Sequence, residues 1–126
     1  MNAIEINEFG KAENLKLLFE NLEIIDWGDL PDFDIIINAT SVGLKEKDKF
    51  GIDFAQKGNN KLFYDVIYEP FKTEFSENGT KTGNNFVNGL NMFLYQAQKA
   101  FKIWHNIEPE INDEVIEFIK IKDEMK

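Results

Sequence analysis

Short apolar runs, separated by polar and turn-forming stretches, predict several β-strands along the chain. Residues 34–38 (Asp-Ile-Ile-Ile-Asn) form a continuous β-branched run between turn residues, which is typical of a strand buried on both faces. Residues 61–68 form a second apolar run, which Pro70 should end because proline cannot donate to a strand ladder. Residues 22–27 and the weakly alternating residues 1–7 predict two further short strands.

Three other stretches have the spacing of amphipathic helices. Residues 10–21 carry apolar side chains among lysines and glutamates, which predicts a helix of about three turns. Residues 89–105 predict a long helix, and residues 111–126 predict another one after Pro109. The long helix should pack through a stripe of apolar residues, which consists of Leu90, Phe93, Ala97, Ala100, Phe101 and Trp104.

The stretches between the predicted strands are long enough for the crossovers that parallel strands require, so a repeated β-α-β arrangement is the simplest assembly. We therefore expect an α/β fold, with a parallel sheet, flanking helices and two C-terminal helices. A doubly wound nucleotide-binding sheet normally opens with a strand, a glycine-rich turn and a helix. The chain contains no Gly-x-Gly-x-x-Gly sequence. Either the fold binds no dinucleotide, or the first unit of such a sheet is missing.

Length and composition limit the classes of function. The 126 residues suffice for one domain or a piece of one. A net charge of −9 disfavours binding to nucleic acid or to an anionic membrane surface, and no apolar run is long enough for a transmembrane helix. Arginine and cysteine are absent, which excludes guanidinium anion clamps, disulfides and thiolate chemistry. We therefore expect a cytoplasmic protein without a signal peptide.

Small and hydroxylated residues follow the first buried strand directly. Asn38, Ala39 and Thr40 lie at its carboxyl end, which is the end that lines the ligand crevice in open parallel sheets. Residues of this size let a flat ligand approach the backbone. Taken alone, a simple turn explains them better, because Asn38 and the nearby Gly43 tolerate many backbone conformations.

Tyr68, Gly89 and Gln96 are further candidates, each with a plainer explanation beside it. Tyr68 ends the next buried strand and would project towards the same crevice, although half-burial against a helix is an equally good account. Gly89 and Gln96 lie about two turns apart on one face of the predicted long helix. Gly89 would let a ligand approach closely, and Gln96 offers an amide donor and acceptor. An ordinary helix start and an ordinary surface residue explain this pair as well.

Taken together, three segments resemble the motifs of the shikimate dehydrogenase family. Residues 34–44 (Asp-Ile-Ile-Ile-Asn-Ala-Thr-Ser-Val-Gly-Leu) are similar to its Asn-Ala-Thr-x-x-Gly-Met/Leu signature. Residues 64–70 resemble its Tyr/Asp-x-x-Tyr-x-Pro strand. Residues 88–96 resemble its Asn-Gly-Leu-x-Met-Leu-x-x-Gln helix, and residues 107–109 resemble the Glu-Pro turn that follows. Order and spacing agree over nearly the whole chain.

The resemblance implies the C-terminal, cofactor-binding portion of an oxidoreductase with a partial Rossmann-like sheet. Members of the family reduce 3-dehydroshikimate to shikimate with NADPH in aromatic amino-acid biosynthesis. Motif matching then implies that residues 38–40 lie along the dinucleotide and that Val66 and Gly89 contact its nicotinamide end. It also implies that Tyr68 and Gln96 reach the hydroxyls and the carboxylate of the substrate.

Several parts of the family pattern are absent from the sequence. The substrate domain with its Lys and Asp is missing, so we expect no catalytic residue in this chain and an absent N-terminal domain as its intramolecular partner. The first β-α-β unit is missing too, so residues 1–126 are expected to be the C-terminal part of one dinucleotide-binding domain. Residues 7–9 (Asn-Glu-Phe) stand where the family has Asn-Arg-Thr, so an acid replaces the arginine that meets the 2′-phosphate of NADP. NADP is the expected cofactor, and NAD is not excluded.

Two alternatives stay open at this point. The first is a non-catalytic Rossmann-like binding module, and the second is a relative of the family that acts on quinate. The coding sequence upstream of Met1 would separate a module from a piece of an enzyme. The residues leave open whether the protein forms a homodimer. No metal site is expected, because His105, the only histidine, is explained by its place at a helix end, where a cation is favoured.

Overall fold

A computed structural model of the chain describes residues 2–5, 9–45, 47–55 and 58–124. The elements in chain order are β1 (Asn2–Glu5), α1 (Phe9–Leu18), β2 (Leu22–Ile25), β3 (Ile35–Asn38), β4 (Leu62–Asp65), α2 (Glu74–Lys81), β5 (Asn85–Val87), α3 (Leu90–His105) and α4 (Asp113–Glu124). Asn7 and Glu8, on which the comparison with Asn-Arg-Thr rests, lie outside the described residues. The same is true of the outermost residues of the predicted first strand and last helix.

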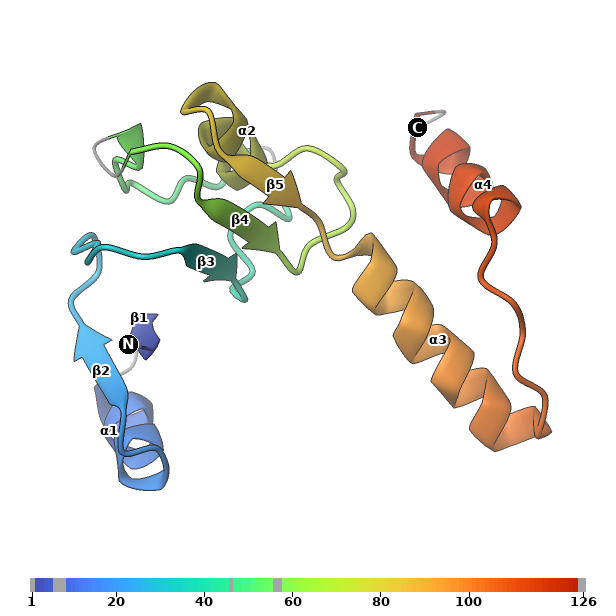
Figure 1. The fold of residues 1–126 in the computed structure, drawn as a ribbon, viewed down its shortest axis with the longest axis horizontal. Helices are drawn as coiled ribbons and strands as arrows, with labels where there is room; N and C mark the ends of the chain where they lie inside the picture. Colours follow the sequence, from blue (N-terminus) through green and yellow to red (C-terminus); the bar gives the residue numbers. More distant parts are fainter. Residues whose placement is uncertain (1, 6–8, 46, 56–57, 125–126) are drawn as a thin grey trace.

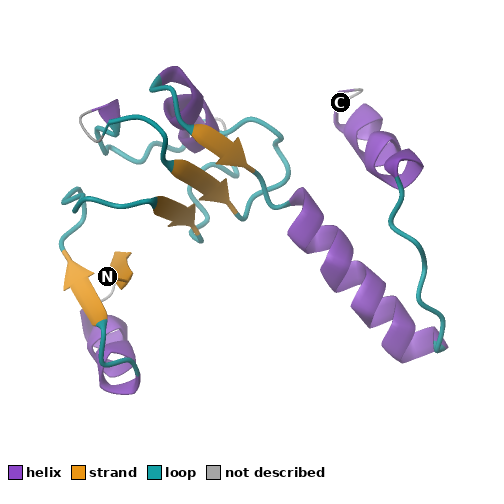
Figure 2. Cartoon of the chain, viewed as in Figure 1, coloured by secondary structure: helices purple, strands orange, loops and turns teal. Residues whose placement is uncertain are grey.

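The described strands pair in parallel and form two sheets (Figure 2). β1 pairs with β2, with Asn2 opposite Leu22. β4 lies between β3 and β5, with Ile35 opposite Leu62 and Leu62 opposite Asn85. α1 and α2 are helical crossovers, whereas a long loop joins β3 to β4. This arrangement confirms the α/β fold expected from the sequence.

Four phenylalanines form the core on one face of the β3–β4–β5 sheet. They are Phe50, Phe54, Phe63 and Phe75. Phe63 of β4 and Phe75 of α2 are almost completely buried, and their ring centroids lie 5.1 Å apart. Phe50 and Phe54 come from the loop between β3 and β4. The loop and α2 together therefore cover this face of the sheet.

α2 begins with a reciprocal cap. The backbone N–H of Ser76 donates to the Thr73 hydroxyl, and the backbone N–H of Thr73 donates to the Ser76 hydroxyl. This capping box satisfies two backbone donors that the first helical turn leaves unpaired. The sequence pattern predicts neither α2 nor β5, because α2 has few apolar positions and β5 has only 3 residues.

The opposite face of the β3–β4–β5 sheet is uncovered within the described part of the chain. Ile35 and Ile37 of β3 are 56% and 61% exposed. Ile36 and Asn38 point to the other face, where Ile36 packs against the phenylalanine core and Asn38 is buried. The prediction that residues 34–38 are buried on both faces is therefore wrong for this chain. No described helix packs over the two exposed isoleucines.

α3 starts at its N-cap, Gly89, as expected, and leads away from the sheet (Figure 1). Leu90 and Leu94 near its beginning are buried. Further along, Phe101 and Trp104 are 40% and 76% exposed. The prediction that the helix packs through the whole apolar stripe is therefore wrong, because the described residues supply no partner for its outer part.

Among the described helices, none combines the length and apolar character needed to cross a bilayer.

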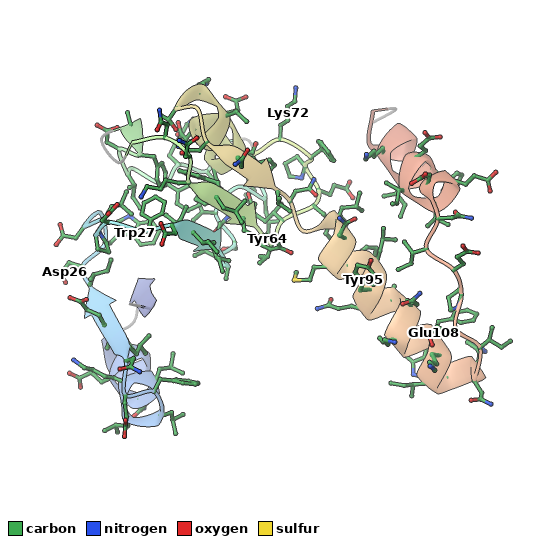
Figure 3. The ribbon with its side chains drawn as sticks, viewed as in Figure 1. Asp26, Trp27, Tyr64, Lys72, Tyr95 and Glu108 are labelled. Atoms are coloured by element: carbon green, nitrogen blue, oxygen red, sulfur yellow. The ribbon has the colours of Figure 1, made fainter. Side chains whose placement is uncertain are left out.

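Side-chain contacts tie the segment after α3 back to that helix. The Gln98 side-chain amide donates to the backbone carbonyl of Pro109 over 2.8 Å. The carboxylate of Glu108 accepts hydrogen bonds from Lys99 Nζ, at 2.8 Å, and from Lys102 Nζ. Glu108 lies beside the last turns of α3 in Figure 3. These contacts fix the direction in which the chain turns towards α4.

Trp27, which follows β2, connects the first half of the chain to the phenylalanine core. Its indole N–H donates to the backbone carbonyl of Phe50 over 3.0 Å. The two rings are stacked, with centroids 6.2 Å apart and planes inclined by 7°. Figure 3 shows Trp27 near the start of the segment that leads from β2 to the second sheet. The stacked pair therefore anchors this connecting segment.

Gly79→Ala should destabilise the chain even though alanine is the better helix former. A Cβ at this position of α2 would lie 2.8 Å from Cγ of Phe63, which is fully buried and enclosed by other aromatic rings. Overpacking of this kind costs about 1–3 kcal/mol, against a gain of about 1 kcal/mol in helix propensity. Urea denaturation should therefore show a lower free energy of unfolding. Asn78→Ala in the same helix is the control, and an equal stabilisation by both changes would contradict the prediction.

Glu108 should titrate far below an ordinary glutamate. Hydrogen bonds from Lys102 and Lys99, with their positive charges, lower the pKa of the Glu108 carboxyl from 4.5 to about 2. Because the folded-state pKa is the lower one, the ionised pair stabilises the fold above the ordinary pKa, and this contribution is lost as the pH falls towards 2. NMR titration of the carboxyl carbon should give the midpoint. Lys102→Gln should raise the pKa, and an unchanged midpoint would contradict the assignment.

Candidate functional site

The carboxyl ends of β3 and β4 lie at one edge of the sheet and bring residues 38–40 close to Val66 and Tyr68. Asn38, the last residue of β3, stands opposite Asp65, the last residue of β4. The backbone N–H of Val66 donates to the carbonyl of Asn38 over 3.0 Å. Residues 39–43 and residues 66–70 therefore leave the sheet side by side, as parallel pairing requires. The first loop carries the expected dinucleotide residues, and the second carries Val66 and Tyr68.

Asp65 lies at the centre of this edge and is completely buried. Its Oδ1 accepts hydrogen bonds from the Asn38 side-chain amide, at 2.9 Å, and from the backbone N–H of Ile67, at 3.0 Å. Its Oδ2 accepts a hydrogen bond of 2.6 Å from the Thr73 hydroxyl. A buried carboxylate is tolerated when several donors satisfy it, as they do here.

The Asn38 side chain shapes the loop that follows β3. Its oxygen accepts from both the backbone N–H and the hydroxyl of Thr40, at 3.0 and 2.8 Å, and its amide also donates to the carbonyl of Val42. The hydrogen bonds of the Asn38 side chain are thus all made within the protein, whereas Ala39 and Thr40 are exposed at the sheet edge. Gly43 closes the loop with a φ of +110°, a conformation that favours glycine.

Gly89 lies directly against the turn after β4. A Cβ at this position would stand only 2.0 Å from the carbonyl oxygen of Val66, and the N–H of Gly89 donates to the carbonyl of Ile67 over 3.2 Å. Contact between two backbones therefore already requires glycine here. Beside it, the Asn88 side chain accepts from the backbone N–H of Leu90. The contact brings Val66 and Gly89, the two residues predicted at the nicotinamide end, into direct proximity.

Tyr68 packs against the start of α3. Its ring stacks on Phe93, with centroids 4.4 Å apart and planes inclined by 20°, and it is half-buried. Gln96 is exposed on α3, three residues beyond Phe93, which corresponds to about 4.5 Å along the helix axis. The structure thus brings Tyr68 to the same part of α3 as Gln96, although no contact joins their side chains among the hydrogen bonds and ring contacts described above.

The residues present fit one end of a dinucleotide better than the other. At the sheet edge, exposed small residues (Ala39 and Thr40) adjoin the turn that begins at the half-buried Val66, and Gly89 is buried against that turn. A phosphate cradle of the Gly-x-Gly-x-x-Gly type is absent from the sequence. Within the described residues, no group of histidine, aspartate and glutamate side chains could hold a metal ion.

The sequence pattern does not single out Asp65 and Thr73, whose side chains link the segments at this edge. A signal was available, because Asp65 is a carboxylate inside an otherwise apolar run. Such a residue is rarely buried without partners. The identity of those partners depends on three segments that the fold brings together, so the sequence alone does not reveal them.

The chain matches known proteins over most of its length, although it matches no family model. It is 51% identical over 111 residues to shikimate dehydrogenase (NADP(+)) of Pelagibacter ubique. The aligned region covers 88% of this chain and 42% of that protein. It is 41% identical over 83 residues to the enzyme of the same name from Staphylococcus aureus, covering 66% of this chain and 31% of that protein.

A solved structure agrees with these relatives. Shikimate 5-dehydrogenase from Listeria monocytogenes, in complex with shikimate and NAD, matches the chain with a TM-score of 0.76 and 26% identity. The match covers 94% of this chain and 47% of that protein. The chain thus spans less than half the length of the relatives it matches. By sequence and by its Rossmann-like fold, the chain belongs to the shikimate dehydrogenase family of oxidoreductases and corresponds to one region of its members.

Proposed function

We propose that the chain is the C-terminal, cofactor-binding portion of an enzyme that reduces 3-dehydroshikimate to shikimate. The observation that carries this proposal is the meeting of residues 38–40, Val66, Tyr68 and Gly89 at one edge of a parallel sheet. Open parallel sheets bind ligands at this edge. The Pelagibacter relative, which is named for shikimate and NADP(+), supports the same reaction.

The cofactor side of the proposed site consists of residues 38–40, Val66 and Gly89, with Ala39 and Thr40 exposed and the buried Asn38 shaping the loop beneath them. A bound nicotinamide dinucleotide supplies the hydride for reduction of the ketone. The exposed loop residues would lie along the dinucleotide, and the close pair of Val66 and Gly89 would meet its nicotinamide end. NADP is the proposed cofactor, in line with the names of the relatives, and NAD is the alternative, because the Listeria protein was solved with NAD.

The substrate side of the proposed site consists of Tyr68 and Gln96. A phenol hydroxyl and an amide are suited to a substrate with several hydroxyls and a carboxylate, because both can donate hydrogen bonds. Stacking on Phe93 restricts the ring of Tyr68 to one orientation. Gln96 lies three residues after Phe93 on the same helix, and we therefore expect it to meet the same ligand as Tyr68.

The proposed protein needs further parts that this sequence does not contain. Proton transfer requires a group within hydrogen-bond reach of the substrate, and the family's Lys and Asp lie in an N-terminal domain. The first β-α-β unit is also required. Among the described strands, β1 pairs only with β2 and β3 pairs only with β4, so a strand of the missing unit would fit between β1 and β3. Homodimer formation and a cytoplasmic location remain predictions.

The chain alone should not oxidise shikimate, whereas a chimera should. In the chimera, this chain replaces the matching 111 residues of the Pelagibacter relative, which supplies the remaining domain. NADPH formation from shikimate and NADP should occur in the chimera at a rate comparable to that of the parent relative. Quinate is the parallel substrate, and faster turnover of quinate would favour a quinate enzyme.

A folded chimera that binds NADP without turnover would instead support a non-catalytic binding module. Circular dichroism and thermal melting establish whether the chimera is folded. Turnover by the isolated chain at the rate of the parent enzyme would contradict the proposal that catalytic groups lie elsewhere.

Gln96→Ala in the chimera should lower kcat/KM for shikimate by about tenfold or more. Loss of a hydrogen bond to a charged substrate group costs about 1.5–3 kcal/mol, and ~1.4 kcal/mol corresponds to a factor of ten. The KM for NADP should hardly change. Gln98→Ala is the matched control, because the Gln98 side-chain amide donates a hydrogen bond to the Pro109 carbonyl and is not part of the proposed substrate side. Weaker NADP binding with unchanged shikimate kinetics would show that Gln96 belongs to the cofactor side.

A further inference from the structure

We propose that Asp65 is a positioning residue that fixes the cofactor loop and the substrate turn relative to each other. The cofactor loop comprises residues 38–43, and the substrate turn comprises residues 66–70. This inference rests on the proposed function for the ligands of the two segments. Asp65 itself is completely buried beneath the sheet edge and therefore acts through its neighbours.

One branch of hydrogen bonds runs from Asp65 into the cofactor loop. Oδ1 holds the Asn38 amide at 2.9 Å, which turns the Asn38 oxygen towards Thr40. That oxygen binds both the backbone N–H and the hydroxyl of Thr40, and the hydroxyl in turn accepts from the N–H of Val42. The path of the exposed loop is thus determined by the orientation of one amide, and Asp65 sets that orientation.

The second branch runs into the substrate turn and α3. The same Oδ1 accepts from the backbone N–H of Ile67, two residues after Asp65. The carbonyl of Ile67 then accepts from the N–H of Gly89, the N-cap of α3. The turn that carries Val66 and Tyr68 is therefore held between Asp65 and the helix that carries Gln96.

Thr73 supplies the third donor and adds a second link to the cofactor loop. Its hydroxyl donates to Asp65 Oδ2 over 2.6 Å and caps α2 by accepting from Ser76. Its side chain also packs on the loop, because a Cβ at Gly43 would lie 3.2 Å from the Thr73 side chain. The hydroxyl must donate to the acid and accept from the helix at the same time, and the Thr73 hydroxyl does both.

The chemistry of three converging donors favours a carboxylate over an amide at residue 65. Two N–H groups and one hydroxyl point at its two oxygens. Asparagine has the same shape, but it would present an NH₂ group to one of these donors. A buried donor left without an acceptor is costly, so the segments would rearrange. Asp65→Asn therefore perturbs both ligand segments while the side-chain volume stays nearly constant.

The test compares four variants in the chimera with the Pelagibacter relative: Asp65→Asn, Thr73→Val, Thr73→Ser and Phe75→Leu. Asp65→Asn should raise the KM for both NADP and shikimate and should lower kcat/KM by tenfold or more. Thr73→Val, which removes the hydroxyl, should act in the same direction. Thr73→Ser, which keeps the hydroxyl, should have KM and kcat values close to those of the parent chimera.

Phe75→Leu is the control for loss of stability alone. Phe75 is a fully buried core residue with no place in the hydrogen-bond network. Its replacement should lower the melting temperature and leave both KM values unchanged, because unfolding reduces only the amount of active protein. If Asp65→Asn likewise lowers the melting temperature with unchanged KM values, or if only one of the two KM values rises, the positioning role is wrong.

A second measurement separates this proposal from the proposed function. If the parent chimera is inactive, the reaction assignment fails, and the coupling is then read from amide NMR signals of the chain itself. Asp65→Asn should shift the signals of Thr40, Ile67 and Gly89 together, whereas Phe75→Leu should not. A variant in which Ile67 shifts and Thr40 stays in place would overturn the link between the two segments.

Discussion

Parallel pairing of β4 with both β3 and β5 is the constraint on which the rest of the structure depends. It places the carboxyl ends of β3 and β4 at one edge, so residues 27 positions apart, Asn38 and Asp65, become neighbours. It also directs alternate side chains of β4 to opposite faces, with Phe63 and Asp65 on the side covered by α2. A slip of one residue in this register would exchange the faces and remove both the core and the site.

Much of the fold could be predicted because the strands are marked by local chemistry. The β-branched run before Asn38 became β3, and α3 begins at Gly89 as expected. The apolar run before Pro70 became β4, but this strand already ends at Asp65, so Tyr68 lies in the following turn and not at the end of a strand. β5 was missed because three residues give no periodic pattern. α2 was missed because a capping box and a single large apolar residue, Phe75, stabilise it in place of an apolar stripe.

Errors arose where a pattern shows which side of an element can be buried without showing what covers it. Ile35, Ile37 and the outer stripe of α3 have the composition of buried surfaces, yet they are exposed in this chain. The site residues were predicted through motif resemblance, and their meeting at one edge follows from the parallel sheet. The role of Asp65 was out of reach, because it depends on donors from three other positions that only the folded chain brings together.

The two tryptophans give each half of the chain its own optical signal. Trp27 is stacked on Phe50, so its fluorescence should respond when the segment after β2 separates from the phenylalanine core. Trp104 is 76% exposed near the end of α3, so it should emit at the long wavelength of a hydrated indole. Contact between the apolar stripe of α3 and another protein surface would shift that emission to shorter wavelength. Replacing one tryptophan at a time by phenylalanine would therefore allow each event to be followed by itself, without an attached dye.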